Sequence, residues 1–173
     1  IRTFDSWTFR ILCKLGHLPE ELLLKSHDDN IMILVDFLRS PEKSKILDLL
    51  KNIKHLVIDE VQDLAGVRGD LVVELLKLIA PRENSDIGFT LLGDASQSIY
   101  AFSVRNSDRV SIHGETTNTL IRTLNEIYGN DLRSLPLDKN YRASPKLAIF
   151  LERLRKILSR DLPGEDKFEA MSK

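Results

Sequence analysis

The feature that most constrains the fold is an alternation of two short β-prone runs with a helical segment between them. The first run, His55–Ile58, ends abruptly at Asp59 and Glu60. The second run, residues 88–92, ends at Gly93 and Asp94. Because both runs are rich in apolar and β-prone residues, we interpret them as buried strands. The strand–helix–strand order predicts an α/β fold with a parallel sheet flanked by helices.

Apolar residues at helical spacing mark most of the remaining chain. The spacing predicts helices over residues 3–15, 20–24, 31–38, 71–79 and 115–128. Ser40 followed by Pro41 has the form of an N-cap and a first-turn proline, so we expect a further helix toward Leu50. We therefore expect residues 1–53 to form a largely helical part beside a core of residues 54–160.

The carboxyl-terminal part of the core holds two further predicted elements. Residues 132–137 are interpreted as a third strand, which Pro136 interrupts. Ser144 and Pro145 are typical of the start of a helix. Residues 161–173 are predicted to be a polar tail. The residues of the last helix that are expected to face inward include Leu147, Phe150 and Leu154.

The charge balance limits the kinds of partner that the chain can bind. The 173 residues include 25 Lys and Arg against 26 Asp and Glu, which gives a formal net charge of -1. This balance excludes a protein that coats nucleic acid by overall positive charge, so any nucleic-acid site must be local. The single cysteine, Cys13, excludes an internal disulfide and a cysteine-cluster metal site.

The sequence also bears on location. It contains no apolar run of the roughly 18 residues that a membrane-spanning helix needs, so we expect no membrane partner. The first residues lack the order of a signal peptide and include no initiator methionine. We therefore expect a piece of a longer polypeptide in a reducing compartment, the cytoplasm or, in a eukaryote, the nucleus.

Carboxylates follow both predicted strands. Since the carboxyl ends of parallel strands meet at one edge of a sheet, Asp59, Glu60 and Asp94 should lie near one another. A carboxylate in this position can hold Mg²⁺, and a neighbouring one can polarise an attacking water. The alternative is that these acidic residues only solvate the turns that follow the strands.

Two later segments carry side chains suited to bases and phosphates. Gln97 can form hydrogen bonds with a phosphate or a water, and Tyr100 and Phe102 present aromatic faces on which single-stranded bases stack. Arg142 follows a predicted strand and can reach a phosphate, while Tyr141 can stack on a base. The alternatives are two core aromatics, an arginine bonded to backbone carbonyls and a tyrosine packed at a helix entry.

Four strings taken together resemble a known family. DEVQD at residues 59–63, GDASQSIYAF at 93–102 and NYR at 140–142 match the DExxQD, GDxxQSIYxF/W and NYR boxes of the UvrD/Rep family of superfamily 1 helicases. TFDSW at residues 3–7 is similar to the TFHS-type box of that family. The resemblance implies a RecA-like P-loop NTPase domain of an ATP-dependent DNA helicase, active in processes such as DNA repair.

The resemblance also implies roles for residues at the nucleotide. Asp59 would coordinate Mg²⁺, and Glu60 would activate the hydrolytic water. Gln97 would sense the γ-phosphate of ATP and couple it to DNA, and Asp94 would lie beside the nucleotide. Arg142 would act as a γ-phosphate finger. Tyr141 would bind the nucleotide by stacking on adenine, without a catalytic role.

The implied partners are single-stranded DNA, duplex junctions and the remaining domains of the same helicase. The residues that the resemblance places on DNA are Thr3, Phe4, Ser6, Tyr100 and Phe102.

The sequence departs from the family pattern in ways that keep alternatives open. It contains no G-x-x-x-x-G-K-S/T string, so we expect the P-loop and its strand to lie upstream of Ile1 and the chain alone to be inactive. Asp5 stands where the family commonly has histidine. The alternatives are an ATP-inert interaction or regulatory module on a helicase scaffold, and the motor part of a helicase–nuclease.

Overall fold

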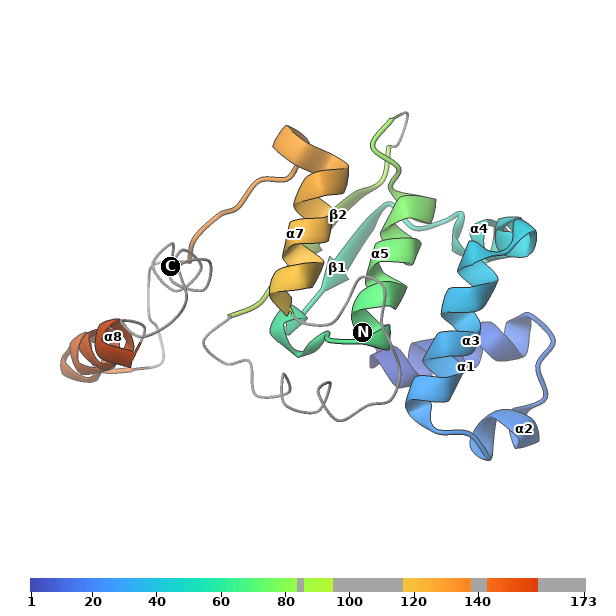
Figure 1. The fold of residues 1–173 in the computed structure, drawn as a ribbon, viewed down its shortest axis with the longest axis horizontal. Helices are drawn as coiled ribbons and strands as arrows, with labels where there is room; N and C mark the ends of the chain where they lie inside the picture. Colours follow the sequence, from blue (N-terminus) through green and yellow to red (C-terminus); the bar gives the residue numbers. More distant parts are fainter. Residues whose placement is uncertain (84–85, 95–116, 138–142, 159–173) are drawn as a thin grey trace. The chain divides into compact units, whose positions relative to one another are not determined.

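The computed structural model describes residues 1–83, 86–94, 117–137 and 143–158, in two compact units. Figure 1 shows the elements of both units. The described elements of the first unit, Ile1–Asp131, are α1 (Phe4–Lys14), α2 (Pro19–Leu23), α3 (His27–Arg39), α4 (Ser44–Leu50), β1 (His55–Ile58), α5 (Val67–Ile79), β2 (Gly88–Leu91) and α7 (Thr117–Tyr128). Within the second unit, Leu132–Lys173, the described element is α8 (Pro145–Leu158).

Side-chain caps mark the starts of α1 and α3. The Thr3 hydroxyl accepts a hydrogen bond from the Ser6 N–H at 3.3 Å and caps α1. Ser26 caps α3 in a capping box with Asp29, in which each side chain accepts from the other residue's backbone. Ser40 accepts from the Glu42 N–H at 3.2 Å, which confirms the predicted cap, although a short 3₁₀ turn precedes α4.

One hydrophobic core joins the helical residues to the sheet. Apolar faces of α1 to α5 bury Leu12, Leu34 and Leu71 completely. Leu56 of β1 and Phe89 of β2 pack against the same core. The helices predicted over residues 3–15, 20–24, 31–38, 71–79 and 115–128 are therefore confirmed where the chain is described, with ends shifted by a few residues. No helix in the described ranges is long and apolar enough to span a bilayer.

The sheet is parallel, as predicted. In the described residues it has two strands, β1 and β2, with His55 opposite Gly88 and Ile58 opposite Leu91. The Phe89 ring lies against Tyr128 of α7, with the ring centroids 5.0 Å apart, and Leu56 packs on the core that includes α5. Helices α5 and α7 therefore cover one face of the sheet, as Figure 1 shows. The α/β class is confirmed as a mixed fold with a small parallel sheet.

The prediction that both strands are buried is wrong for the opposite face. Val57 is 58% exposed, and His55 and Thr90 are exposed as well. The His55 imidazole Nε2 and the Thr90 hydroxyl form a hydrogen bond of 2.9 Å across this face. The physical reason is that, among the described residues, helices pack on only one side of the sheet, so alternate side chains reach solvent.

The predicted third strand at residues 132–137 is also wrong. This segment is described and forms no strand. Leu135 and Leu137 are both largely exposed. Pro136 has no N–H to donate to a neighbouring strand, and the described residues of this unit offer no strand to pair with.

The last helix forms where it was expected, but its apolar residues do not face inward. The Ser144 hydroxyl accepts from the Leu147 N–H at 3.4 Å, consistent with the predicted start of α8. Phe150 is 59% exposed, and Leu147 and Leu154 are exposed too, which corrects the prediction of a buried face. The described part of this unit contains no second helix or strand against which α8 could pack.

Candidate functional site at the ends of two parallel strands

The carboxyl ends of β1 and β2 bring together the two acidic segments that follow these strands, residues 59–63 and residues 93–94. The Leu92 N–H donates to the Ile58 carbonyl oxygen at 2.8 Å, and the Val61 N–H donates to the Leu92 carbonyl oxygen at 2.9 Å. These bonds extend the pairing of the strands beyond their last residues. Asp59 and Glu60 therefore lie at the same edge of the sheet as Asp94, as predicted.

Glu60 adopts an unusual backbone conformation. Its φ of 54° and ψ of 44° place it in the left-handed region, and it is the one residue other than glycine with a positive φ in the described ranges. The Glu60 N–H donates to the Asp59 carboxylate at 2.9 Å. Both residues are exposed, so their carboxylates are accessible to water and to a cation. Left-handed backbone at such a residue costs on the order of 1 kcal/mol, and strained conformations of this kind cluster at functional sites.

Gln62 connects the two segments, and sequence reasoning did not select it. Its side-chain amide N–H donates to a Glu60 carboxylate oxygen. Its amide oxygen accepts from the Asp94 N–H at 3.0 Å. The side chain is almost completely buried, at 3% exposure. The signal in the sequence was the position of Gln62 within residues 59–63. That motif predicted a catalytic site, but it did not distinguish the residues that take part in catalysis from those that support them.

Gly93 permits the close approach of the two segments. A Cβ at this position would lie 2.5 Å from the Val61 Cγ1 and 2.7 Å from the Gln62 Oε1. Both distances are shorter than nonbonded carbon and oxygen atoms tolerate. The space that a side chain would need at Gly93 is therefore occupied by the residues that follow β1.

The donor set suits a magnesium ion that is shared with phosphates. No group of three His, Cys, Asp or Glu residues able to hold a metal occurs in the part of the chain that the structure describes. Mg²⁺ usually binds one or two carboxylates, waters and substrate phosphates instead of an all-protein cage. The exposed Asp59 carboxylate, with Glu60 beside it, fits this mode of binding.

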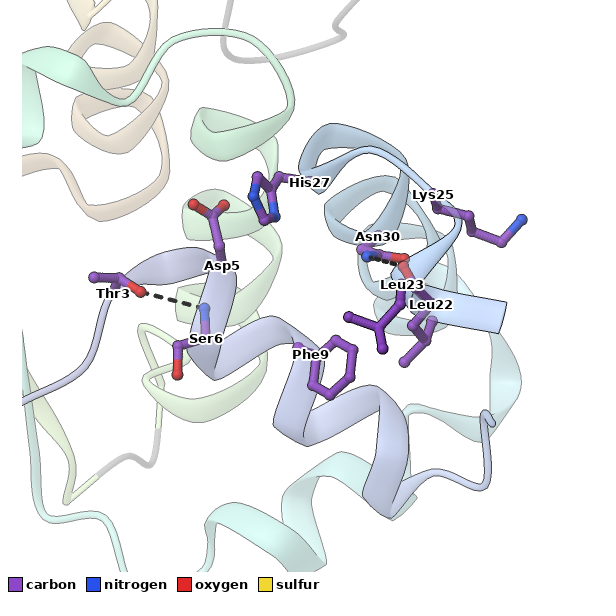
Figure 2. Close-up of a pocket in the computed structure, with 9 residues that line it drawn as sticks. All are labelled: Thr3, Asp5, Ser6, Phe9, Leu22, Leu23, Lys25, His27 and Asn30. Carbon is purple, nitrogen blue, oxygen red and sulfur yellow. Dashed lines mark hydrogen bonds between the residues drawn. The ribbon is translucent and has the colours of Figure 1, made fainter. Parts of the chain in front are cut away.

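A second candidate region surrounds the start of α1. A cavity of about 490 Å³ lies between α1, α2 and the start of α3. Figure 2 shows the residues that line it. Thr3 and Ser6 line it, and the Thr3 hydroxyl is engaged in capping the helix. Phe4 does not line the cavity, because its side chain packs partly buried against the core. The complete lining consists of Thr3, Asp5, Ser6, Phe9, Leu22, Leu23, Lys25, His27 and Asn30.

An arginine pairs with the acid at the start of α1. Arg68 of α5 lies 3.3 Å from the Asp5 carboxylate and also pairs with Asp28 of α3. These two ion pairs join the beginning of α1 and the beginning of α3 to the beginning of α5, which follows residues 59–63 in the chain. Asp5 therefore does not present an unpaired negative charge to a phosphate.

The remaining predicted site residues lie outside the described residues. They are Gln97, Tyr100, Phe102, Tyr141 and Arg142. The structure therefore brings together Asp59, Glu60 and Asp94 of the predicted nucleotide site, and Thr3 and Ser6 of the predicted DNA site.

Comparisons with known proteins identify relatives of the chain. Residues 4–115 match the family of the UvrD/REP helicase N-terminal domain. The ATP-dependent DNA helicase srs2 of Schizosaccharomyces pombe is 34% identical over 75% of this chain and 12% of its own length. The ATP-dependent DNA helicase Rep of Buchnera aphidicola is 32% identical over 69% of this chain and 16% of its own length.

The comparisons also define the extent of the similarity. The helicase SRS2 of Saccharomyces cerevisiae is 34% identical over 49% of this chain and 8% of its own length. The chain thus spans a small fraction of the relatives that it matches, and no solved structure matches it. Because the family match covers residues 4–115, more than half of the sequence, the chain belongs to the UvrD/Rep helicase family.

Proposed function

We propose that this chain is part of the motor of an ATP-dependent DNA helicase. The motor hydrolyses ATP and uses the energy to move along single-stranded DNA and unwind duplexes. The observation that carries the proposal is the meeting of Asp59, Glu60 and Asp94 at one edge of a parallel sheet. Open α/β sheets bind nucleotides at this edge.

Each carboxylate has a distinct role in the proposal. Asp59 holds Mg²⁺, which neutralises phosphate charge when bound, and Glu60 orients the attacking water and takes its proton. Asp94 lies beside the nucleotide. The exposure of Asp59 and Glu60 supports these roles, since both carboxylates are open to ligands from solvent.

The residues outside the described ranges complete the proposed machinery. Gln97 relays the state of the γ-phosphate, Tyr141 stacks on adenine and Arg142 stabilises the transferred phosphoryl group. Tyr100 and Phe102 stack on bases. Of the described residues, Thr3, Phe4 and Ser6 at the start of α1 complete the proposed contact with the single strand. The partners are single-stranded DNA, duplex junctions and the other domains of the same helicase.

Turnover by a helicase polypeptide that contains this chain tests the proposal. Glu60→Gln should abolish DNA-stimulated ATP hydrolysis while ATP binding persists, because the amide cannot accept the proton of the attacking water. Glu42→Gln is the matched control, since Glu42 is an exposed carboxylate before α4 that pairs with Lys45 and belongs to neither of the segments that follow the strands. Unchanged turnover in Glu60→Gln would contradict the proposal.

The 173-residue chain itself provides a second test. Phosphoryl transfer depends on positioning the β- and γ-phosphates, and the chain has no P-loop string to do so. We expect no measurable ATP hydrolysis by the purified chain. Robust turnover that is insensitive to Glu60→Gln would overturn both the need for a P-loop and the catalytic role of Glu60.

A further inference from the structure

We propose that Gln62 is a positioning residue that fixes the Glu60 carboxylate relative to the loop after β2. The kinetic part of this inference rests on the proposed function, whereas the geometric part rests on the described contacts alone. Gln62 donates to Glu60 through its amide nitrogen and accepts from the Asp94 N–H through its amide oxygen. One side chain therefore links the two segments that meet at the edge of the sheet.

The burial of Gln62 makes both bonds necessary. At 3% exposure, its amide has almost no access to water. A buried amide is costly unless its donors and acceptor are satisfied, and the bond to a carboxylate is stronger than one between neutral groups. Glutamine is suited to this position because a single planar group supplies a donor at one atom and an acceptor at the other.

The link has a consequence for Glu60. The Glu60 side chain is exposed, and its rotatable bonds give a free carboxylate several orientations. The hydrogen bond from Gln62 holds one carboxylate oxygen, so the other is directed to accept a proton. Because the Asp94 N–H holds the opposite end of the same amide, a displacement of the Asp94 backbone would move Gln62 and thereby the Glu60 carboxylate.

Two substitutions separate the two ends of the amide. Gln62→Met has a similar volume and removes both hydrogen bonds. Gln62→Glu keeps an oxygen that can accept from the Asp94 N–H but replaces the amide donor with a second carboxyl group against Glu60. That group either repels the Glu60 carboxylate or shares a proton with it, and both outcomes impair Glu60 as a base. Thermal melting of each variant reports whether the fold persists.

Amide hydrogen exchange in the 173-residue chain, followed by NMR, tests the geometry without any activity. The Asp94 N–H should be protected in the unsubstituted chain and should exchange about 2- to 12-fold faster in Gln62→Met, the factor expected for one hydrogen bond. In Gln62→Glu its exchange should stay slow. The Leu92 N–H, which donates to Ile58, is the internal control and should not change.

Steady-state kinetics of the helicase polypeptide test the consequence. Both variants should lower kcat for ATP by about 10- to 100-fold with KM nearly unchanged, because they misplace a group that acts in the chemical step. A purely structural role would lower the melting temperature and leave kcat unchanged in Gln62→Glu.

The outcomes are distinguishable. An Asp94 N–H that exchanges at the unprotected rate while the Leu92 N–H remains protected in the unsubstituted chain overturns the positioning role by itself, even if both variants fail to fold. Loss of turnover in Glu60→Gln together with unsubstituted-level kcat in both Gln62 variants overturns the positioning role and leaves the proposed function intact. Full turnover in Glu60→Gln contradicts the proposed function, and the exchange of the Asp94 N–H then still decides whether Gln62 holds the loop.

Discussion

The Val61 N–H donates to the carbonyl oxygen of Leu92 at 2.9 Å, beyond the last residues of both strands. Backbone groups therefore contribute to the spacing between the residues that follow β1 and those that follow β2, together with the bond from the Asp94 N–H to the Gln62 side chain. Side-chain substitutions at Asp59 or Glu60 leave this spacing in place, because both carboxylates are exposed and neither contributes to the ladder. Loss of activity in such variants consequently reports on chemistry.

Gly93→Ala should destabilise the end of the sheet. The added methyl group would lie 2.5 Å from the Val61 Cγ1 and 2.7 Å from the Gln62 Oε1, so both must move. We expect the free energy of unfolding to fall by about 1–3 kcal/mol, the usual cost of overpacking. Urea denaturation measures the change, with Asp36→Ala on the exposed side of α3 as a control that should be nearly neutral. A loss of less than about 0.5 kcal/mol would show that the two loops separate easily.

Thr3→Ala should destabilise α1. The Thr3 hydroxyl accepts from the Ser6 N–H, and loss of an N-cap costs about 1 kcal/mol. Thr3→Ser keeps the hydroxyl and should retain the stability, while Ser6→Ala keeps the donating N–H and should change it little. Equal stability of Thr3→Ala and Thr3→Ser in urea would mean that the cap contributes nothing.

Tyr128 should make the fold sensitive to alkaline pH. Burial raises the pKa of Tyr128 above its ordinary value of 10.0. Above about pH 10 the unfolded chain loses the phenol proton while the folded chain retains it, so the free energy of unfolding falls as pH rises through the folded pKa. Below about pH 10 the phenol is protonated in both states, so this contribution to the free energy of unfolding is fully present.

Tyr128→Phe should remove this part of the alkaline loss. It also removes the hydrogen bond that the phenol donates to the Ala80 carbonyl oxygen at 2.9 Å, at a cost of about 1 kcal/mol near neutral pH. Urea titrations at several pH values measure both effects. The other tyrosines are present in both proteins, so an identical alkaline slope would contradict the role of Tyr128.

Phe102→Ala should weaken the binding of single-stranded DNA by a helicase polypeptide that contains this chain. Loss of one stacking platform costs about 1–3 kcal/mol of binding free energy. Fluorescence anisotropy with a labelled oligonucleotide measures the affinity, and Phe150→Ala on α8 is the control at an exposed aromatic. Unchanged affinity with a lowered melting temperature would show that Phe102 is a core residue.

The local elements were predictable because their signals are local. Ser40 capped the residues before α4 as its side-chain chemistry indicates, and His55–Ile58 formed a strand over the predicted residues. The position of Asp59 and Asp94 at one edge followed from the parallel direction of the strands. These features depend on neighbouring residues or on strand direction, which the sequence pattern contains.

The features that were not predictable depend on what covers an element. Val57 looks the same in the sequence whether a helix packs over it or solvent does, and the structure leaves it exposed. The β-prone residues 132–137 lack a partner strand in the described part of their unit, so local propensity did not suffice. Gln62 was missed because its role arises from hydrogen bonds with Glu60 and Asp94. The sequence shows that Gln62 is near Glu60 along the chain, but it does not show that the two side chains are bonded or that Asp94 lies beside them.

The left-handed backbone at Glu60 sets a trade-off for anyone who selects this chain for thermostability. Glycine is the residue that adopts such a conformation without steric cost, so Glu60→Gly should relieve strain at φ 54°. The same replacement deletes the carboxylate that the proposed chemistry requires. It also removes the acceptor of the buried Gln62 amide, which opposes the relief of backbone strain. A library meant to yield active variants should therefore keep codon 60 fixed.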